Sequence, residues 1–370
     1  MIDRDEFSAW LRLLETPGVG REAARALLAR FGSPDAVLGA STAARAAVVP
    51  AAIASALATA PEPFEARLAV GWQWLQGGDE PRDAIALGDP RYPAALLESP
   101  DPPLLLYVRG RIALLQSPAI AIVGSRNPTA QGLENARAFA AHLSGVGWTV
   151  VSGLAFGIDA AAHEGALAGG GATIAVVGTG LDIDYPTRHR ALASKIAATG
   201  LLMSEFAVGT PALAANFPVR NRIIAGLARG TLVVEAAVQS GSLITARLAT
   251  EAGREVFAIP GSIHSPQSRG CHALIKQGAK LVDSAADIVE ELAPLRTDRT
   301  ALPHPRPTPS LPMPKDPILD ALGFDPIGLD ALVARTGTSA AELSARLLEL
   351  ELQGRVARLP GQLFQRIERA

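Results

Sequence analysis

The residues with the clearest chemical potential lie in residues 216–226, which read NFPVRNRIIAG. Arg220 and Arg222 carry planar guanidinium groups, which suit the oxygens of phosphate. Phe217 adds a flat ring on which any nucleobase can stack. This combination predicts a surface that holds nucleic acid without reading its sequence. The alternative interpretation is the start of a helix with a solvated basic edge.

Short apolar runs bounded by glycine alternate with Ala-rich amphipathic segments over much of the chain. Continuous apolar strands separated by helices indicate a parallel sheet that is covered on both faces. Right-handed crossovers then predict an α/β fold, an extended Rossmann-like doubly wound sheet. The expected strands are residues 119–123, 149–151, 173–177, 201–203, 232–234 and 256–259.

Small and polar residues directly follow these strands. In an open α/β sheet ligands bind at the carboxyl ends of the strands, where backbone amides and helix N-termini favour anions. Arg126 lies in the first of these loops and can converge there with Arg220. The other residues that we expect at this nucleic-acid-binding edge are Gly124, Ser125, Gly153, Asn221, Ser240, Gly241 and Ser242.

The motifs of several other functions are missing from the sequence. No loop has the P-loop pattern, and none has a GxGxxG followed by an acid, so we expect no ATP, NAD or other cofactor. Asp159 and His163 are four residues apart behind Ser152, but we interpret His163 as a packing or helix-surface residue rather than a catalytic base. The lone Cys271 excludes an intramolecular disulfide and a Cys-based zinc site, and we expect no metal site.

The composition limits the kind of nucleic-acid surface that the chain can form. The 370 residues include 34 Lys and Arg against 36 Asp and Glu, for a formal net charge of −2. No global positive field is present, so the binding surface must be a local patch. The acidic first residues do not resemble a signal peptide, and no apolar run is long enough to span a bilayer. We therefore expect a cytoplasmic protein without a membrane segment.

Changes in composition predict four regions. Residues 1–75 have helical apolar spacing around the turn at 16–20, which indicates either a helix-hairpin-helix, of the kind found in small SAM-like modules, or an ordinary αα-hairpin. In the first case Arg21 and Arg25 could assist phosphate binding. Residues 84–293 form the Rossmann-like domain, and the Pro-rich residues 294–315 form a linker. Residues 316–370 have the helix, helix, hairpin order of a winged helix, with Ser339 as an N-cap; that shape can bind DNA or contact proteins.

From about residue 88 to residue 292 the chain resembles the DNA-processing protein A family, also called DprA or Smf. Many ordered motifs carry this resemblance, and the terminal regions resemble the accessory domains of that family with weaker signatures. The matching motifs are GSR at 124–126, SGLAFGID at 152–159, GTGLD at 178–182 with Tyr185 and Pro186, SEF at 204–206, FPVRNRIIAGL at 217–227, Glu235-Ala236, SGSLITA at 240–246 and IPG at 259–261.

The resemblance implies a homodimeric protein without catalytic activity that binds single-stranded DNA. It implies a role in natural transformation, in which the protein shields incoming strands and helps to load the RecA recombinase. By similarity, Arg126 would hold a phosphate, Phe217 would stack a base and Arg220 would line the same basic pocket. Ser125, Ser240 and Gly241 would add polar contacts.

Two positions depart from the family pattern. Many members have Lys where this chain has Ala214, three residues before Phe217, and many have Lys where it has Thr187. Arg188 and Arg190 could supply the missing charge. The alternative function is a Rossmann-fold nucleotide hydrolase of the phosphoribohydrolase type, often called lysine-decarboxylase-like. Such enzymes need a PGGxGTxxE motif, of which this chain has only Pro-Gly-Ser at 260–262.

Overall fold

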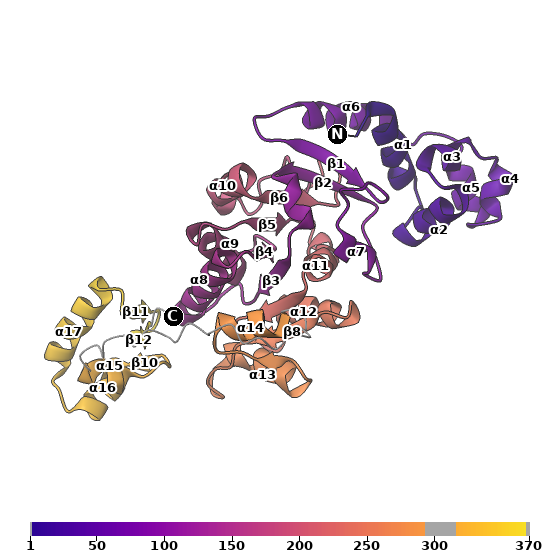
Figure 1. Cartoon of the computed structure of the whole chain (residues 1–370). Helices are drawn as coiled ribbons and strands as arrows, with labels where there is room; N and C mark the ends of the chain where they lie inside the picture. The colour runs from indigo at the N-terminus through magenta and orange to yellow at the C-terminus, as the bar shows by residue number, and fades with distance from the viewer. Residues whose placement is uncertain (1, 293–315, 368–370) are drawn as a thin grey trace, which may run out of the picture.

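The computed structural model describes residues 2–292 and 316–367. A nine-stranded sheet forms its centre, with the N-terminal helices at one edge (Figure 1). The strands are β1 (Arg82–Ala86), β2 (Leu105–Gly110), β3 (Ala119–Val123), β4 (Thr149–Ser152), β5 (Thr173–Val176), β6 (Leu201–Ser204), β7 (Gly230–Val233), β8 (Glu255–Ala258) and β9 (Lys280–Leu281).

The strand order is β1-β2-β6-β5-β4-β3-β7-β8-β9. The seven strands from β6 to β9 are parallel, whereas β2 is antiparallel to both β1 and β6. The chain starts the parallel part at β3, adds β4, β5 and β6 on one side, and then returns to place β7, β8 and β9 on the other. The direction of winding therefore changes between β3 and β7, which is where such folds bind ligands.

Helices cover both faces of the sheet because its central strands are apolar on both sides. Ile120 and Ile122 of β3 pack against α8, α9 and α14, while Ala121 and Val123 face α11, α12 and α13. The helices of this domain are α7 (Ala94–Leu97), α8 (Ala130–Gly145), α9 (Ile158–Ala168), α10 (Arg190–Thr199), α11 (Asn216–Leu227), α12 (Gly241–Glu251), α13 (Arg269–Lys276) and α14 (Ala285–Leu292), with the short 3₁₀ helices η1 (Ile112–Gln116), η2 (Thr187–His189) and η3 (Pro266–Ser268).

The N-terminal helices share a hydrophobic core with the antiparallel edge of the sheet. Phe7 is fully buried and meets Tyr107 of β2 edge to face, with the ring centroids 6.2 Å apart. The first two helices are joined by the turn at residues 16–20, in which Gly18 has a φ of 82°. The helices are α1 (Arg4–Glu15), α2 (Arg21–Phe31), α3 (Pro34–Gly39), α4 (Thr42–Ala46), α5 (Ala51–Ala56) and α6 (Phe64–Gln76).

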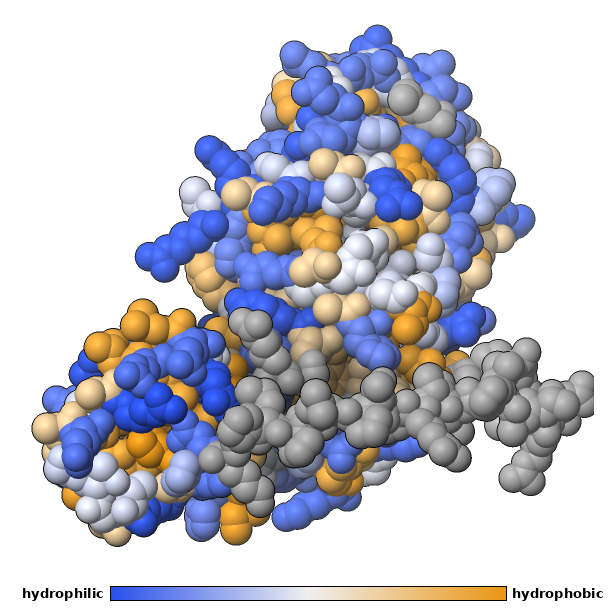
Figure 2. All heavy atoms as spheres, turned by 60° about the vertical axis from the view of Figure 1, so that its left-hand side comes forward, coloured by the Kyte–Doolittle hydropathy of each residue, from blue (hydrophilic) through white to orange (hydrophobic). Residues whose placement is uncertain are grey.

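The C-terminal winged-helix domain has its own core, which includes Leu332, Leu343 and Leu347. Ser339 caps its longest helix in a capping box with Glu342, as the sequence predicted. Figure 2 shows apolar side chains on the surface of this domain. Its elements are α15 (Pro317–Leu322), β10 (Ile327–Gly328), α16 (Leu329–Thr336), α17 (Ala340–Leu352), β11 (Val356–Leu359) and β12 (Leu363–Arg366).

The structure confirms the predicted α/β fold and each of the six predicted strands to within two residues. Three strands of the nine-stranded sheet were not predicted: the antiparallel pair β1 and β2, and the two-residue β9. The two-residue β10 of the winged-helix domain was not predicted either. The predicted linker at 294–315 lies outside the described residues. Among the helices that the structure describes, none is long and apolar enough to cross a membrane.

Candidate nucleic-acid interface

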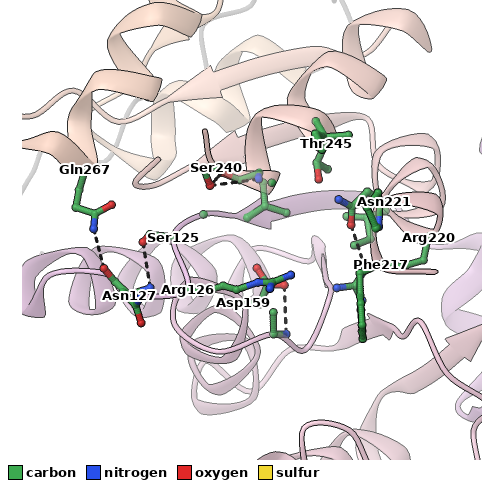
Figure 3. Close-up of a pocket in the computed structure, with 18 residues that line it drawn as sticks. Ser125, Arg126, Asn127, Asp159, Phe217, Arg220, Asn221, Ser240, Thr245 and Gln267 are labelled. Atoms are coloured by element: carbon green, nitrogen blue, oxygen red, sulfur yellow. Dashed lines mark hydrogen bonds between the residues drawn. The ribbon is translucent and has the colours of Figure 1, made fainter. Parts of the chain in front are cut away.

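A cavity of about 410 Å³ opens where the winding of the sheet changes direction, at the carboxyl ends of β3 and β7 (Figure 3). The loops after these two strands leave toward helices on opposite faces, so a crevice remains between them. Its wall combines the β3–α8 loop, the start of α11 and the start of α12. Nine of the ten predicted binding residues line it: Gly124, Ser125, Arg126, Phe217, Arg220, Asn221, Ser240, Gly241 and Ser242. The tenth, Gly153, lies behind Arg220.

The loop after β3 presents Arg126 to solvent. Ser125 Oγ accepts a hydrogen bond from Asn127 N at 3.1 Å, and Gln267 Nε2 donates to Asn127 O at 2.9 Å (Figure 3). These bonds fix Ser125 and Asn127, the residues on either side of Arg126, and leave the Arg126 guanidinium exposed. Among the described residues Arg126 has no acidic partner within ion-pair distance. An exposed cation held by a fixed loop suits a phosphate.

Glu235, which follows β7, fixes the start of α8. Its carboxylate accepts hydrogen bonds from Thr129 N at 2.9 Å and Thr129 Oγ1 at 2.6 Å, and Thr129 Oγ1 in turn accepts from Gly132 N. A Cβ at Gly132 would lie 2.7 Å from Glu235 Oε1, so only glycine permits this approach. Burial raises the pKa of Glu235, while the bonds from Thr129 oppose that rise. The two loops at the change of winding are thus tied to each other.

Arg220 forms part of the wall from inside the protein. Its Nη1 donates to Gly153 O at 2.6 Å and to Val176 O, and its Nε donates to Asn221 Oδ1 at 3.0 Å. Only 4% of the residue is exposed. Burial lowers the pKa of Arg220 to about 10, although the nearby charge of Asp159 acts to raise it. The guanidinium therefore binds main-chain carbonyls at the ends of β4 and β5.

Asp159 completes the buried charged group around Gly153. Its Oδ2 accepts hydrogen bonds from Gly153 N at 3.1 Å and from Ala155 N at 3.3 Å. Burial raises the pKa of Asp159, and the nearby charge of Arg220 lowers it. A Cβ at Gly153 would lie 2.5 Å from Arg220 Cζ and 2.7 Å from Asp159 Oδ2. Gly153 is therefore required by these two side chains rather than by the approach of a ligand.

Phe217 occupies the first turn of α11 at the rim of the cavity. Its ring packs against Tyr185, with centroids 5.3 Å apart and planes at 34°, and a Cβ at Gly178 would lie 3.0 Å from Phe217 Cδ1. The close approach of Gly178 and Tyr185 fixes the orientation of the ring. Phe217 thus has the rigid, partly exposed face that stacking requires.

The N-terminus of α12 faces the same cavity. Ser240 caps the helix by accepting from Ser242 N at 3.3 Å, and the two hydroxyl oxygens are 2.7 Å apart. A Cβ at Gly241 would meet nothing within 4 Å, so the space in front of this helix start is open. Free amides at a helix N-terminus favour an anion. This end of the cavity is polar and lies across from Arg126 (Figure 3).

The structure corrects the prediction that Arg222 is a basic contact. Its side chain is 11% exposed and binds Asp101 at 2.8 Å and Glu205 at 2.6 Å, so its charge is compensated inside the protein. Arg21 and Arg25 also bind Asp101, at 2.8 and 2.6 Å, and are not placed to serve a phosphate at the 16–20 turn.

Two other predicted cations remain at the surface. Arg190 pairs with Asp184 at 2.6 Å, whereas Arg188 is exposed and has no ion pair among the described residues. Ala214 lies exposed in the segment before α11, where many members of the resembling family have Lys. Arg188 is therefore the better candidate to replace that charge.

Ser152 and His163 are not arranged as a nucleophile and its base. Ser152 Oγ donates to Ile122 O at 2.6 Å, whereas His163 Nδ1 lies 2.7 Å from Thr173 Oγ1. Because Thr173 Oγ1 donates to Val150 O, His163 Nδ1 must carry the proton that joins it to Thr173. His163 Nε2 is then an unprotonated nitrogen, buried without a partner among the described residues.

We expect His163 to make the folded protein sensitive to acid. Burial lowers its pKa from the ordinary 6.5 to about 3, so between these values the unfolded chain binds more protons and stability falls as the pH falls. Urea midpoints at pH 7.5 and 4.5 would measure this loss, which should reach roughly 2 kcal/mol for the wild type. His163→Gln, which does not titrate, should lose less over the same interval. An equal loss in both proteins would remove His163 as the cause.

Several residues of the interface were not predicted as part of it. Glu235 acts through the loops that it joins, whereas Asp159 lines the cavity and also binds Gly153 N. Gln267 reaches the cavity from η3, 140 positions away from its partner Asn127. Thr129 could have been found, because a threonine three residues before Gly132 at a predicted helix start is a typical N-cap. Glu235 and Asp159 lie in motifs that carry the family resemblance, but no role was assigned to them there, and no local pattern indicates Gln267.

The chain is similar in sequence and in structure to several known proteins. The profile described as DNA recombination-mediator protein A matches residues 83–293, and the profile described as DprA winged helix domain matches residues 302–362. Protein Smf of Escherichia coli (strain K12) is 44% identical over 286 residues, which is 75% of this chain and 76% of the relative.

Two solved structures are also similar. The crystal structure of DNA processing protein A from Streptococcus pneumoniae has a TM-score of 0.68 and 38% identity, and the match covers 78% of this chain and 98% of that one. A structure of DNA processing protein A from Helicobacter pylori, which concerns the single-stranded DNA binding mode of that protein, has a TM-score of 0.52 and 30% identity. That match covers 57% of this chain and 95% of the other.

Proposed function

The chain belongs to the DNA recombination-mediator protein A family, DprA/Smf, and on that premise we propose that it binds single-stranded DNA in the cavity between β3 and β7. One observation carries the proposal: an exposed, unpaired Arg126 and the partly exposed ring of Phe217 line the same open cavity. A cation for a phosphate beside a ring for a base is the arrangement by which proteins hold single strands without sequence preference. The Helicobacter pylori relative supports the choice of ligand.

The proposed binding site is confined to the central domain. Residues 316–370 carry eight acidic and six basic side chains, so the net charge of this part of the chain does not favour a polyanion. Duplex DNA has its bases stacked inside and offers Phe217 no exposed base face. The protein should therefore prefer single strands.

The proposal extends to the wider role that the family resemblance implies. The protein would act as a homodimer that protects incoming single strands and helps RecA to assemble on them during natural transformation, without catalysing a reaction. Analytical ultracentrifugation tests the dimer. The rate at which RecA forms filaments on oligo-dT, with and without this protein, tests the loading step; an unchanged rate would remove that step and leave strand binding intact.

We expect the purified protein to bind labelled oligo-dT in preference to a matched duplex, with a strong salt dependence. If about three phosphates are neutralised, log affinity should fall by roughly two units per tenfold rise in salt. Arg126→Ala should weaken binding and reduce that slope by about 0.7, the share of one phosphate on a single strand. Fluorescence anisotropy at several salt concentrations measures both quantities.

The matched control is Arg137→Ala, which removes a partly exposed cation that pairs with Glu164 and does not line the cavity. Its slope should equal that of the wild type. Equal slopes for Arg126→Ala and the wild type would exclude Arg126 as the phosphate contact. Equal affinity for both DNA forms would argue against the proposed function, and release of free base from nucleoside monophosphates would favour the nucleotide hydrolase instead.

A further inference from the structure

A second, smaller cavity adjoins the proposed DNA site. It has a volume of about 50 Å³ and lies between the loops that follow β4 and β5. Arg126, Ala155, Phe217 and Arg220 line both cavities, so the two are neighbours along one surface. The residues that belong only to the smaller cavity include two large aromatic side chains, Phe156 and Tyr185.

Phe156 is held in an exposed position by its surroundings. It is 43% exposed, and its ring meets the ring of His189 edge to face at a centroid distance of 4.9 Å. His189 Nδ1 in turn donates to Leu154 O at 3.0 Å. Leu154 has a φ of 57°, which is uncommon for leucine, and its side chain is buried while Phe156, two residues later, faces solvent. The loop therefore supports an exposed apolar ring instead of burying it.

Tyr185 forms the other side of the same small cavity. It is 45% exposed and stacks at an angle on Phe217, so it extends the aromatic surface of the main site outward. Exposing two large aromatic rings beside each other gains nothing for the stability of the folded chain. Aromatic rings at the surface next to a cationic side chain are characteristic of sites that stack nucleobases.

Arg126 connects the two cavities. Its exposed guanidinium borders both, and a phosphodiester that joins two neighbouring nucleotides must pass between the positions of their bases. We propose that Phe156 and Tyr185 form a second base-stacking subsite, which holds the nucleobase adjacent to the one at Phe217, with the intervening phosphate at Arg126. This inference rests on the proposed function and adds to it that the site holds two neighbouring nucleotides at fixed positions. The subsite accepts any base, because every base has a flat face.

The test compares Phe156→Ala with the wild type on two probes of equal length, oligo-dT and an abasic oligomer. Loss of one stacking contact should weaken binding to oligo-dT by roughly 5- to 150-fold. Binding to the abasic oligomer should be unchanged, because the variant keeps every charge. For the same reason, the salt dependence on oligo-dT should stay at the wild-type slope. Tyr185→Ala should act in the same direction, and Phe156→Tyr should restore binding to near the wild-type value.

Ile183→Ala is the matched control. Ile183 is exposed in the same loop as Tyr185 but lines neither cavity, so its loss should leave the affinity unchanged. If Phe217→Ala weakens binding to oligo-dT while Phe156→Ala does not, the second subsite is refuted and the proposed function stands. An equal loss on both probes would also refute stacking at Phe156, since the effect would not depend on a base. A wild type that does not bind oligo-dT would overturn both proposals.

Discussion

Arg220→Met is expected to lower the free energy of unfolding by about 3–5 kcal/mol at pH 7. The substitution leaves the buried Asp159 without its compensating charge, and it leaves Gly153 O and Val176 O without the donor that Arg220 Nη1 supplies. Removing one partner of a buried charged group costs far more than the group contributes as a whole. The urea midpoint, followed by circular dichroism, measures the loss.

The pH dependence of this loss identifies its cause. Burial already raises the pKa of Asp159, and without Arg220 nothing charged opposes that rise. A carboxyl with a raised pKa in the folded state costs stability as the pH rises through that pKa, so the deficit of Arg220→Met should be larger at pH 8 than at pH 5. A deficit that is constant across this interval would indicate lost packing instead of an uncompensated charge.

A double variant separates the charge from the rest of the side chain. Asp159→Asn with Arg220→Met removes both charges and should recover a substantial part of the stability, because neutral replacements of buried ion pairs are often tolerated. Arg188→Met is the matched control, since Arg188 is exposed without an ion pair among the described residues, and its midpoint should not change. If Arg220→Met unfolds at the wild-type midpoint but no longer binds DNA, then Arg220 contacts the ligand directly.

The contrast between Arg126 and Arg220 shows what the sequence could predict about the site. Arg126 follows an apolar strand and Arg220 lies near the start of a helix, so the sequence placed both at one edge of the sheet. Both line the cavity. Their opposite exposure could not be predicted, because the carbonyls that bind Arg220 lie at the ends of β4 and β5, 67 and 44 residues away. Arg222 is a similar case: its partner Asp101 is 121 residues away.

The strands of the sheet were more predictable than its edges. Ile120 and Ile122 face one layer of helices while Ala121 and Val123 face the other, so β3 is apolar on both sides. That continuous apolar pattern predicts a central parallel strand. In β1, by contrast, Arg82 and Asp83 interrupt the apolar pattern: Arg82 donates to Trp74 O, and Asp83 binds Arg91. Trp74 lies in α6 and Arg91 in the segment between β1 and α7, so contacts outside the strand, not its local pattern, make β1 a strand.

Phe217→Ala is expected to weaken binding to oligo-dT by about 1–3 kcal/mol, which corresponds to roughly 5- to 150-fold in the dissociation constant. The ring at the start of α11 is held by Gly178 and Tyr185 at the rim of the cavity, so it is already oriented to receive a base. A preoriented side chain loses little conformational entropy on binding, and most of the stacking energy then appears as affinity. Anisotropy titrations at one low salt concentration measure the change.

The slope of affinity against salt decides whether stacking explains the loss. Phe217→Ala removes no charge, so its slope should equal that of the wild type, whereas Arg126→Ala should flatten it. Phe217→Trp should keep most of the affinity, because it keeps a flat ring at the same position. Val219→Ala, on the same helix but outside the cavity lining, should bind as the wild type does. A lower slope in Phe217→Ala would mean that the ring positions Arg126 instead of holding a base, since only a lost phosphate contact changes the number of counterions released.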